Sequence, residues 1–452
     1  PRATRPQSAP VCYAQPAYGQ WPVGGRQPGQ QTQLVEQIPP PPITGGGPPI
    51  AVERAVPTPR TVPPVTPIPP AVGLVPGSPF PGLSPYADPA VDVIVDVAEA
   101  PTGRFQIGAG INSDAGVVGT ISLDERNFDW RRPPTSLNDF ATGRAWRGAG
   151  QRFRIEAAPG TQVQRYLVSF QEPYLFDSPV SMGLSGSYFE RRFRDWDEER
   201  LGGRVSLGYQ WVEHDLSSTI SYRGENIKIS NPAVSGIVPE LDAVVGSNSL
   251  HGFGISLVND TRDSGFFPTE GHYFSANVEQ VIGTFDYPRA ILDFQEYALV
   301  RERPDHSGRH VVSARTRLGF TGSNTPIYEN FYAGGFSTIR CFDFRWASPV
   351  RLLGAGAFVE VGGECMWIYS LEYLFPLTAD DMIHGVVFVD FGTVEESVKL
   401  DLDTFRVAPG IGLRITVPAM GPAPIALDFA WGIERARTDH LQVFSFNVGF
   451  TR

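Results

Sequence analysis

The sequence predicts an all-β protein, a 16-stranded antiparallel transmembrane β-barrel with a long loop folded inward, preceded by a proline-rich disordered or extended segment. Composition is the first reason, because 48 glycines, 12% aromatic residues and only 19% charged residues are typical of many short strands joined by turns. Short runs of alternating apolar and polar residues are the second. No uninterrupted run of about 18 apolar residues occurs, which excludes a membrane-spanning helix but not a barrel.

Residues 1–90 predict a linker or tether. They contain 24 of the 42 prolines, including the run from Pro39 to Pro42. Proline fixes φ and removes a backbone donor, so this segment favours an extended or disordered chain over a sheet or a long helix. Residues 91–97 then alternate valine or isoleucine with aspartate and predict one strand, which is too little for a domain.

From Gly103 onward, alternating runs are separated by polar turns. An even number of antiparallel strands is what a closed bacterial barrel requires. We count sixteen runs: 103–112, 115–124, 149–158, 162–171, 180–193, 199–213, 215–229, 247–259, 270–283, 289–303, 309–320, 365–376, 382–391, 405–417, 423–434 and 441–450.

The late runs distinguish a membrane barrel from a soluble sandwich. In 405–417, Ile411, Leu413 and Ile415 alternate with Gly410, Gly412 and Arg414. The polar face of a soluble sandwich tends to be rich in Lys and Glu, whereas this face has small residues and isolated charges of both signs. A lumen lined by such groups, with lipid outside, fits the pattern better.

The stretch from Tyr328 to Phe344 lies in the longest predicted loop, 323–364. Aromatic residues flank Gly334 and Gly335, a pair that permits a tight reversal at positive φ. Arg340 follows and cannot lose its charge, so inside a lumen it would need carboxylates. Glu372 and Asp390, in strands downstream, are the candidates.

The segment GGFSTIRCF resembles the GG...VRGF loop motif of the outer-membrane assembly superfamily that includes BamA. The resemblance implies that Gly334, Gly335, Arg340 and Phe342 form a loop anchored inside the barrel, with Glu372 and Asp390 as partners of the arginine. Cys341 departs from the motif, because the superfamily usually has glycine there.

The resemblance extends over residues 91–113, 258–275 and the C-terminal FSFNVGF. It implies that 91–102 is a remnant strand of a POTRA-like periplasmic domain and that 103–452 is the barrel, placed in the outer membrane with the N-terminal segment in the periplasm. Since the sequence starts at Pro1 without an initiating methionine or a signal segment, we expect the chain to be processed or to be an excerpt from a longer protein.

A closed barrel must join its first and last strands, and these two runs are unequal. Interior glycines weaken the first strand, while the last one carries its apolar residues on the lipid face. We therefore predict a short, weakly paired seam. Its residues are Gly103, Phe105, Gly108 and Gly110 in the first strand and Phe444, Phe446, Val448 and Phe450 in the last.

By resemblance, the expected function is assembly and insertion of outer-membrane β-barrel proteins through this seam, without nucleotide. The implied partners are outer-membrane lipid and unfolded β-barrel clients, with periplasmic chaperones and accessory lipoproteins as further candidates. A two-partner-type secretion pore of the same superfamily and a passive porin are the alternatives. We expect no enzymatic activity, because no histidine pairs with a serine in a GxSxG context.

Composition argues against other partners. The net charge of −11 disfavours nucleic acid, and the three scattered cysteines give no metal site, so no cofactor is expected. Cys341 and Cys365 could form a disulfide across the loop, or remain free thiols. The sequence leaves both states open.

Overall fold

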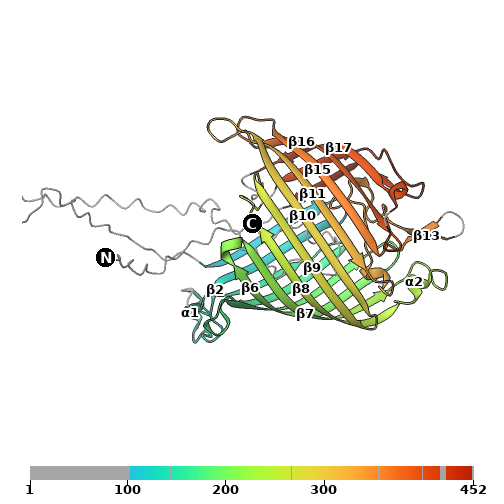
Figure 1. Cartoon of the computed structure of the whole chain (residues 1–452). Helices are drawn as coiled ribbons and strands as arrows, with labels where there is room; N and C mark the ends of the chain where they lie inside the picture. The colour runs from blue at the N-terminus through green and yellow to red at the C-terminus, as the bar shows by residue number, and fades with distance from the viewer. Residues whose placement is uncertain are drawn as a thin grey trace, which may run out of the picture. The chain divides into compact units, whose positions relative to one another are not determined.

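The computed structural model describes residues 102–449, apart from 142–144, 266, 354–356, 400 and 418–423. Sixteen strands in these residues form one closed antiparallel barrel, in the order β1–β11, β15, β16, β17, β18 and β20 (Figure 1). The predicted strand number and closure are confirmed. The expected tether, 1–90, and residues 91–101 of the expected remnant strand 91–102 lie outside the described residues.

The first half of the barrel ends in its longest strands, β6 to β8. Its strands are Gly103–Asn112 (β1), Gly116–Phe128 (β2), Gln151–Ala158 (β3), Val163–Glu172 (β4), Val180–Arg192 (β5), Asp197–Trp211 (β6), Leu216–Ser230 (β7) and Gly246–Asp260 (β8). The second half ends in much shorter strands. These are Gly271–Gly283 (β9), Tyr287–Arg301 (β10), His310–Thr321 (β11), Cys365–Pro376 (β15), Ile383–Glu395 (β16), Arg406–Ile415 (β17), Ile425–Ala430 (β18) and Phe444–Gly449 (β20).

Four short strands lie outside the barrel sheet, and of these only Leu441–Gln442 falls within a predicted run, 441–450. Cys341–Phe342 (β12) pairs with Leu441–Gln442 (β19), and Val350–Leu353 (β13) pairs with Ala357–Glu360 (β14). Two short helices, Leu137–Ala141 (α1) and Pro239–Asp242 (α2), lie in connecting segments, as do the single 3₁₀ turns Leu175–Asp177, Val212–His214, Ile327–Glu329 and Leu402–Thr404.

Two predicted strands near the C-terminus have the wrong extent. The run 423–434 is a regular strand only over β18. Beyond Ala430 the regular ladder ends, although the N–H groups of Trp431 and Ile433 still donate to carbonyl oxygens of β17, and Val407 and Glu434 form an isolated bridge. The run 441–450 is broken at Val443, whose carbonyl oxygen accepts the N–H of Ala430. Alternation continues through both interruptions, which is why periodicity alone did not reveal them.

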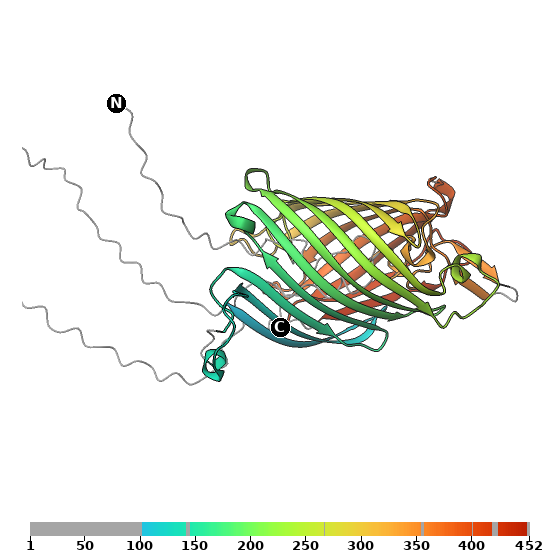
Figure 2. The same cartoon turned by 90° about the horizontal axis from the view of Figure 1, so that it is seen from below.

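Strand periodicity sorts side chains between lipid and lumen. In β7, Ile220 is 64% exposed on the outside, and it pairs in register with Ile255 of β8, which is 58% exposed. Arg223, on the opposite face of β7, points into the lumen and is 1% exposed. Figure 2 shows the barrel from below, with the green strands in front and the orange and red strands behind. The polar interior therefore contains much of the buried charge.

Antiparallel order fixes the end at which each connection lies. Residues 129–150, with α1, connect strands at the end where β1 begins, as do the turns 173–179 and 212–215. The long connections 231–245 and 322–364 are at the opposite end, where Figure 1 shows α2 and β13. No helix among the described residues is both long and apolar enough to cross a membrane.

Candidate functional site

The connection between β11 and β15 comprises residues 322–364, and we call it the luminal loop because its part from Phe331 to Ser348 folds into the lumen. Its residues Phe331, Tyr332 and Phe342 are almost completely buried. Phe331, Ile339 and Phe342 belong to one apolar cluster with Val386 and Phe388 of β16. Val386 and Phe388 lie on the same face of β16 as Asp390. The inner face of β16 is therefore apolar where it packs against the loop and carries a carboxylate where it meets Arg340.

Glycine is required at the reversal of the luminal loop. Gly334 and Gly335 have φ values of 109° and 99°. A Cβ on Gly334 would lie 2.4 Å from the carbonyl oxygen of Asp343, and one on Gly335 would lie 2.5 Å from Oδ2 of Asp114. Cys341 also has positive φ, at 85°. A side chain in this left-handed region costs about 1–2 kcal/mol, so Cys341 carries strain that glycine would not.

Arg340 makes the contacts that were predicted for it. Its Nη1 lies 2.5 Å from Oε1 of Glu372, and its Nη2 lies 2.6 Å from Oδ1 of Asp390. Nε and the backbone N–H of Arg340 also donate to Oδ2 of Asp390, over 2.6 and 3.1 Å. The guanidinium lies 3.3 Å from the centre of the Phe388 ring.

Two further partners were not predicted. Ser370 accepts a hydrogen bond from Nη2 of Arg340 over 3.1 Å and donates one to Asp390 over 2.6 Å. Asp428 of β18 lies 3.6 Å from Nη1 of Arg340 and 2.6 Å from Arg414 of β17. Alternation along β18 places Asp428 on the face opposite Leu427 and Phe429, but only the closure of the barrel brings that face to Arg340.

The luminal loop also contacts both edges of the seam. On the β1 side, the N–H of Phe336 donates to Oδ2 of Asp114, in the β1–β2 turn, over 2.9 Å. Burial raises the pKa of this carboxyl, and the hydrogen bond from Phe336 opposes the rise. On the β20 side, β12 pairs with β19, and the N–H of Asp343 donates to the carbonyl oxygen of His440 over 3.0 Å.

The seam ladder itself is short. Among the described residues, β1 and β20 pair at Gly110 with Gly449, Ile111 with Val448, and Asn112 with Asn447. The ladder between β1 and β2, in contrast, covers every residue from Gly103 to Asn112. The side chains of Asn112 and Asn447 add a hydrogen bond of 3.1 Å at the end next to the luminal loop.

The remaining seam residues are placed as follows. Phe105 of β1 is 64% exposed on the outer face, and Phe444 of β20 is 40% exposed. Phe444 stacks with Phe446, their ring centres 5.9 Å apart. Gly103 and Gly108 pair with β2. Phe450 lies outside the described residues.

Cys341 and Cys365 are both buried free cysteines in the structure, so the disulfide alternative is not formed. Among residues 102–449 with the gaps given above, no cluster of histidine, cysteine, aspartate or glutamate side chains could hold a metal ion. Many of the buried charged groups described above, including Arg340 with Glu372 and Asp390, form ion pairs with one another.

Comparison with known proteins identifies the family. The sequence profile of the Omp85 superfamily domain matches residues 146–451, more than half of the chain. The chain belongs to the Omp85 superfamily.

Relatives within the superfamily are outer-membrane assembly factors. The chain is 27% identical over 376 residues to the outer membrane protein assembly factor BamA of Nitratidesulfovibrio vulgaris (strain Hildenborough), covering 79% of this chain and 43% of that protein. It is 20% identical over 411 residues to BamA of Neisseria meningitidis serogroup B, covering 80% and 48%. The chain thus spans less than half the length of these relatives.

A solved structure shows the same fold. The crystal structure of BamA from Haemophilus ducreyi lacking POTRA domains 1–3 matches with a TM-score of 0.65 at 20% identity, over 78% of this chain and 71% of that one. The protein is an integral outer-membrane β-barrel with a BamA-like barrel region.

Removal of Arg340 is expected to destabilise the barrel. Arg340→Ala leaves Asp390 and Asp428 buried with less neutralising charge, which costs about 3–5 kcal/mol when a buried pair is broken. Arg351→Ala is the matched control, because Arg351 also lies in the luminal loop but is 39% exposed in its pairs with Glu240 and Glu396. We expect it to cost at most about 1 kcal/mol.

Urea unfolding, followed by the mobility of the folded barrel on gels, measures both variants. Equal losses from Arg340→Ala and Arg351→Ala would contradict an anchoring role for Arg340.

The stability of the folded protein should depend on pH through Glu360 of β14, which contacts Arg194 in the connection after β5. Burial raises the pKa of Glu360 to about 7, although Arg194, whose Nη2 lies 3.3 Å from Glu360, lowers it. A carboxyl whose pKa is higher in the folded than in the unfolded protein stabilises the folded state most at pH values below its unfolded pKa. Folded stability therefore falls as pH rises from about 4.5 to 7, by up to about 3 kcal/mol. Glu360→Gln should remove this part of the pH dependence.

The measurement is the difference in urea midpoint between the parent protein and Glu360→Gln from pH 4 to 8. A difference that stays constant across this range would contradict the raised pKa.

Proposed function

We propose that this chain assembles and inserts β-barrel proteins into the outer membrane, acting through the seam between β1 and β20 without nucleotide. The observation that carries the proposal is the three-residue seam ladder of β1 with β20, beside the β1–β2 ladder that covers all of β1. Opening so few pairs exposes strand edges at a small cost in backbone hydrogen bonds. An exposed edge can template an incoming strand by β-augmentation.

The shape of the wall near the seam supports the same proposal. β18 spans six residues and pairs with β20 over Ala426–Phe429, whereas β6, β7 and β8 each span fifteen residues. Short strands present to the lipid an apolar band that is shorter than the hydrocarbon core is thick. A bilayer adapts to this hydrophobic mismatch by thinning. A thinner bilayer beside an openable seam would lower the barrier to insertion of a client.

The luminal loop argues against a passive porin. Arg340 is only 6% exposed and is joined to three carboxylates on the wall, so the loop occupies space that a porin leaves to water. The free energy of the reaction would come from folding of the client, since the chain has no nucleotide motif. Unfolded β-barrel proteins and outer-membrane lipid are the proposed partners, and we infer no enzymatic activity.

A cross-link across the seam should block insertion. The cysteine pair Ile111→Cys and Val448→Cys, placed at a paired position of the seam, is introduced after replacement of the three native cysteines. When oxidised, it should slow insertion of an unfolded barrel client into liposomes by about tenfold or more, because the edge stays paired. Reduction should restore the rate.

The matched control is Ile220→Cys with Ile255→Cys, a registered pair in the continuous wall between β7 and β8. Its oxidation should leave insertion unchanged. Insertion that proceeds normally through an oxidised seam would contradict the proposal and would favour the secretion pore, whose cargo passes through the lumen.

A further inference from the structure

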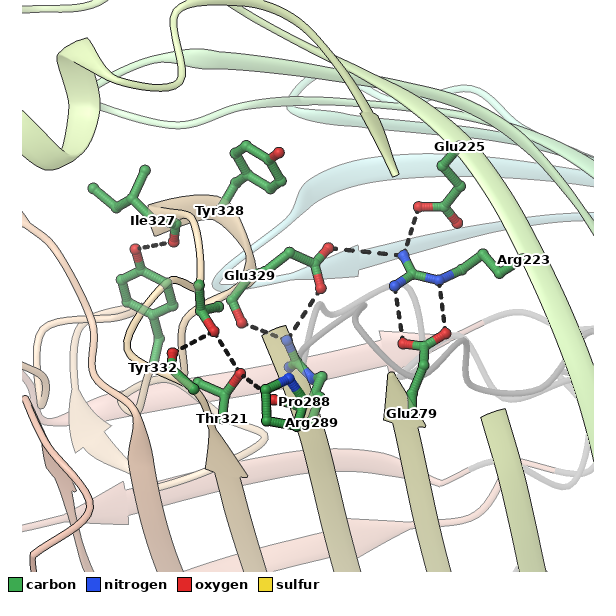
Figure 3. Close-up of polar contacts among 12 residues, drawn as sticks. Arg223, Glu225, Glu279, Pro288, Arg289, Thr321, Ile327, Tyr328, Glu329 and Tyr332 are labelled. Atoms are coloured by element: carbon green, nitrogen blue, oxygen red, sulfur yellow. Dashed lines mark hydrogen bonds and ion pairs between the residues drawn. The ribbon is translucent and has the colours of Figure 1, made fainter. Parts of the chain in front are cut away.

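A second buried charge of the luminal loop lies near its start. Glu329 is the last residue of the 3₁₀ turn Ile327–Glu329 and is fully buried. Its Oε1 lies 2.5 Å from Nη1 of Arg200 in β6, and its Oε2 lies 3.1 Å from Nη1 of Arg289 in β10. Arg223 of β7 is 3.9 Å from Oε1. Figure 3 shows Glu329 between Arg223 and Arg289.

The same arginines also bind the backbone of the turn. Arg289 donates to the carbonyl oxygen of Glu329, and Arg200 donates to that of Tyr328 over 3.0 Å. The hydroxyl of Tyr332 closes the turn by donating to the carbonyl oxygen of Ile327 over 2.8 Å (Figure 3). Both the side chain and the main chain of this segment are therefore held by β6 and β10.

This part of the wall has an excess of positive charge until the loop is seated. Arg223 is neutralised by Glu225 at 2.8 Å and Glu279 at 2.9 Å, and Arg200 also contacts Glu198. Arg204 interacts electrostatically with the same glutamates. Four guanidiniums then face three wall carboxylates. An unmatched buried charge is costly, and Glu329 supplies the missing negative charge.

The Arg340 site has the opposite arrangement. There the wall presents three carboxylates, on β15, β16 and β18, with Arg414 as their neighbour on β17, and the loop supplies a positive charge. The two sites lie in separate sectors of the wall, β6–β10 and β15–β18, with β11 between them in the barrel order.

We propose that Glu329 is a second positioning residue of the luminal loop, and that the opposite charges of Glu329 and Arg340 fix which end of the loop lies on which sector of the wall. The loop is then held by ion pairs to two separate parts of the barrel, β6–β10 and β15–β18. A loop seated in the reverse direction would place like charges against each other at both sites. This inference concerns how the loop is held and does not depend on the proposed function.

Hydrogen exchange of the full-length protein in lipid nanodiscs tests the proposal. In Glu329→Gln, the amides of residues 327–333 should exchange about tenfold faster or more, because the buried ion pairs that hold this segment are lost. Residues 338–343, held by Arg340, should remain protected. The matched control is Glu225→Gln, which removes a carboxylate from the same cluster but from the wall, and should leave 327–333 protected.

A double variant separates positioning from general damage. Arg289 holds Glu329 both through its carboxylate and through its carbonyl oxygen, so Arg289→Gln combined with Glu329→Gln should accelerate exchange of 327–333 by less than the sum of the two single effects, expressed as free energies. Additive effects of the two substitutions would overturn the proposal, as would equal exchange profiles for Glu329→Gln and Glu225→Gln.

Glu329→Gln could prevent folding of the barrel, which its gel mobility would reveal. The comparison is then Glu329→Asp with Glu225→Asp, since each shortens a carboxylate by one methylene. Faster exchange of 327–333 in Glu329→Asp alone would support the proposal, and identical profiles would overturn it. Client insertion is not part of either readout, so failure here and failure of the proposed function are distinguishable.

Discussion

The rest of the structure depends on the need to neutralise Arg340 inside the barrel. A guanidinium cannot lose its proton there, so it requires carboxylates at close range. Asp390 provides a bidentate partner, while Glu372 and Asp428 approach the other side of the group. These carboxylates come from β15, β16 and β18. One loop side chain thereby fixes the relative positions of the strands that precede the seam.

The luminal loop connects this anchor with the seam. Gly334 and Gly335 reverse the chain so that Phe336 meets the β1–β2 turn at Asp114, while Cys341 and Phe342 pair with β19. The stacking of Trp346 on His440, with ring centres 3.7 Å apart, adds to the contact on the β20 side. Displacement of the loop would therefore disturb both seam edges together. We infer that loop position and seam opening are coupled, which gives the anchor a role in the proposed function.

Local patterns predicted most of the fold and part of the site. Alternation gave the number and order of the barrel strands, and the glycine pair followed by Arg340 indicated an anchored loop. The resemblance supplied Glu372 and Asp390. Asp428 was missed because Arg340 is distant from it in sequence, and Glu329 was missed because its partners lie on β6, β7 and β10. Only closure of the barrel brings these groups together. The break at Val443 was missed for a related reason, since it depends on pairing with β12.

Reactivity of the native Cys341 thiol is the most direct test of the account. Cys341 follows Arg340 and is 1% exposed. In the membrane-embedded protein, with Cys12 and Cys365 replaced by serine, a membrane-impermeant maleimide should leave Cys341 unlabelled until the barrel is unfolded. Rapid labelling of Cys341 in the folded barrel would show that the loop is not anchored in the lumen and would contradict the account.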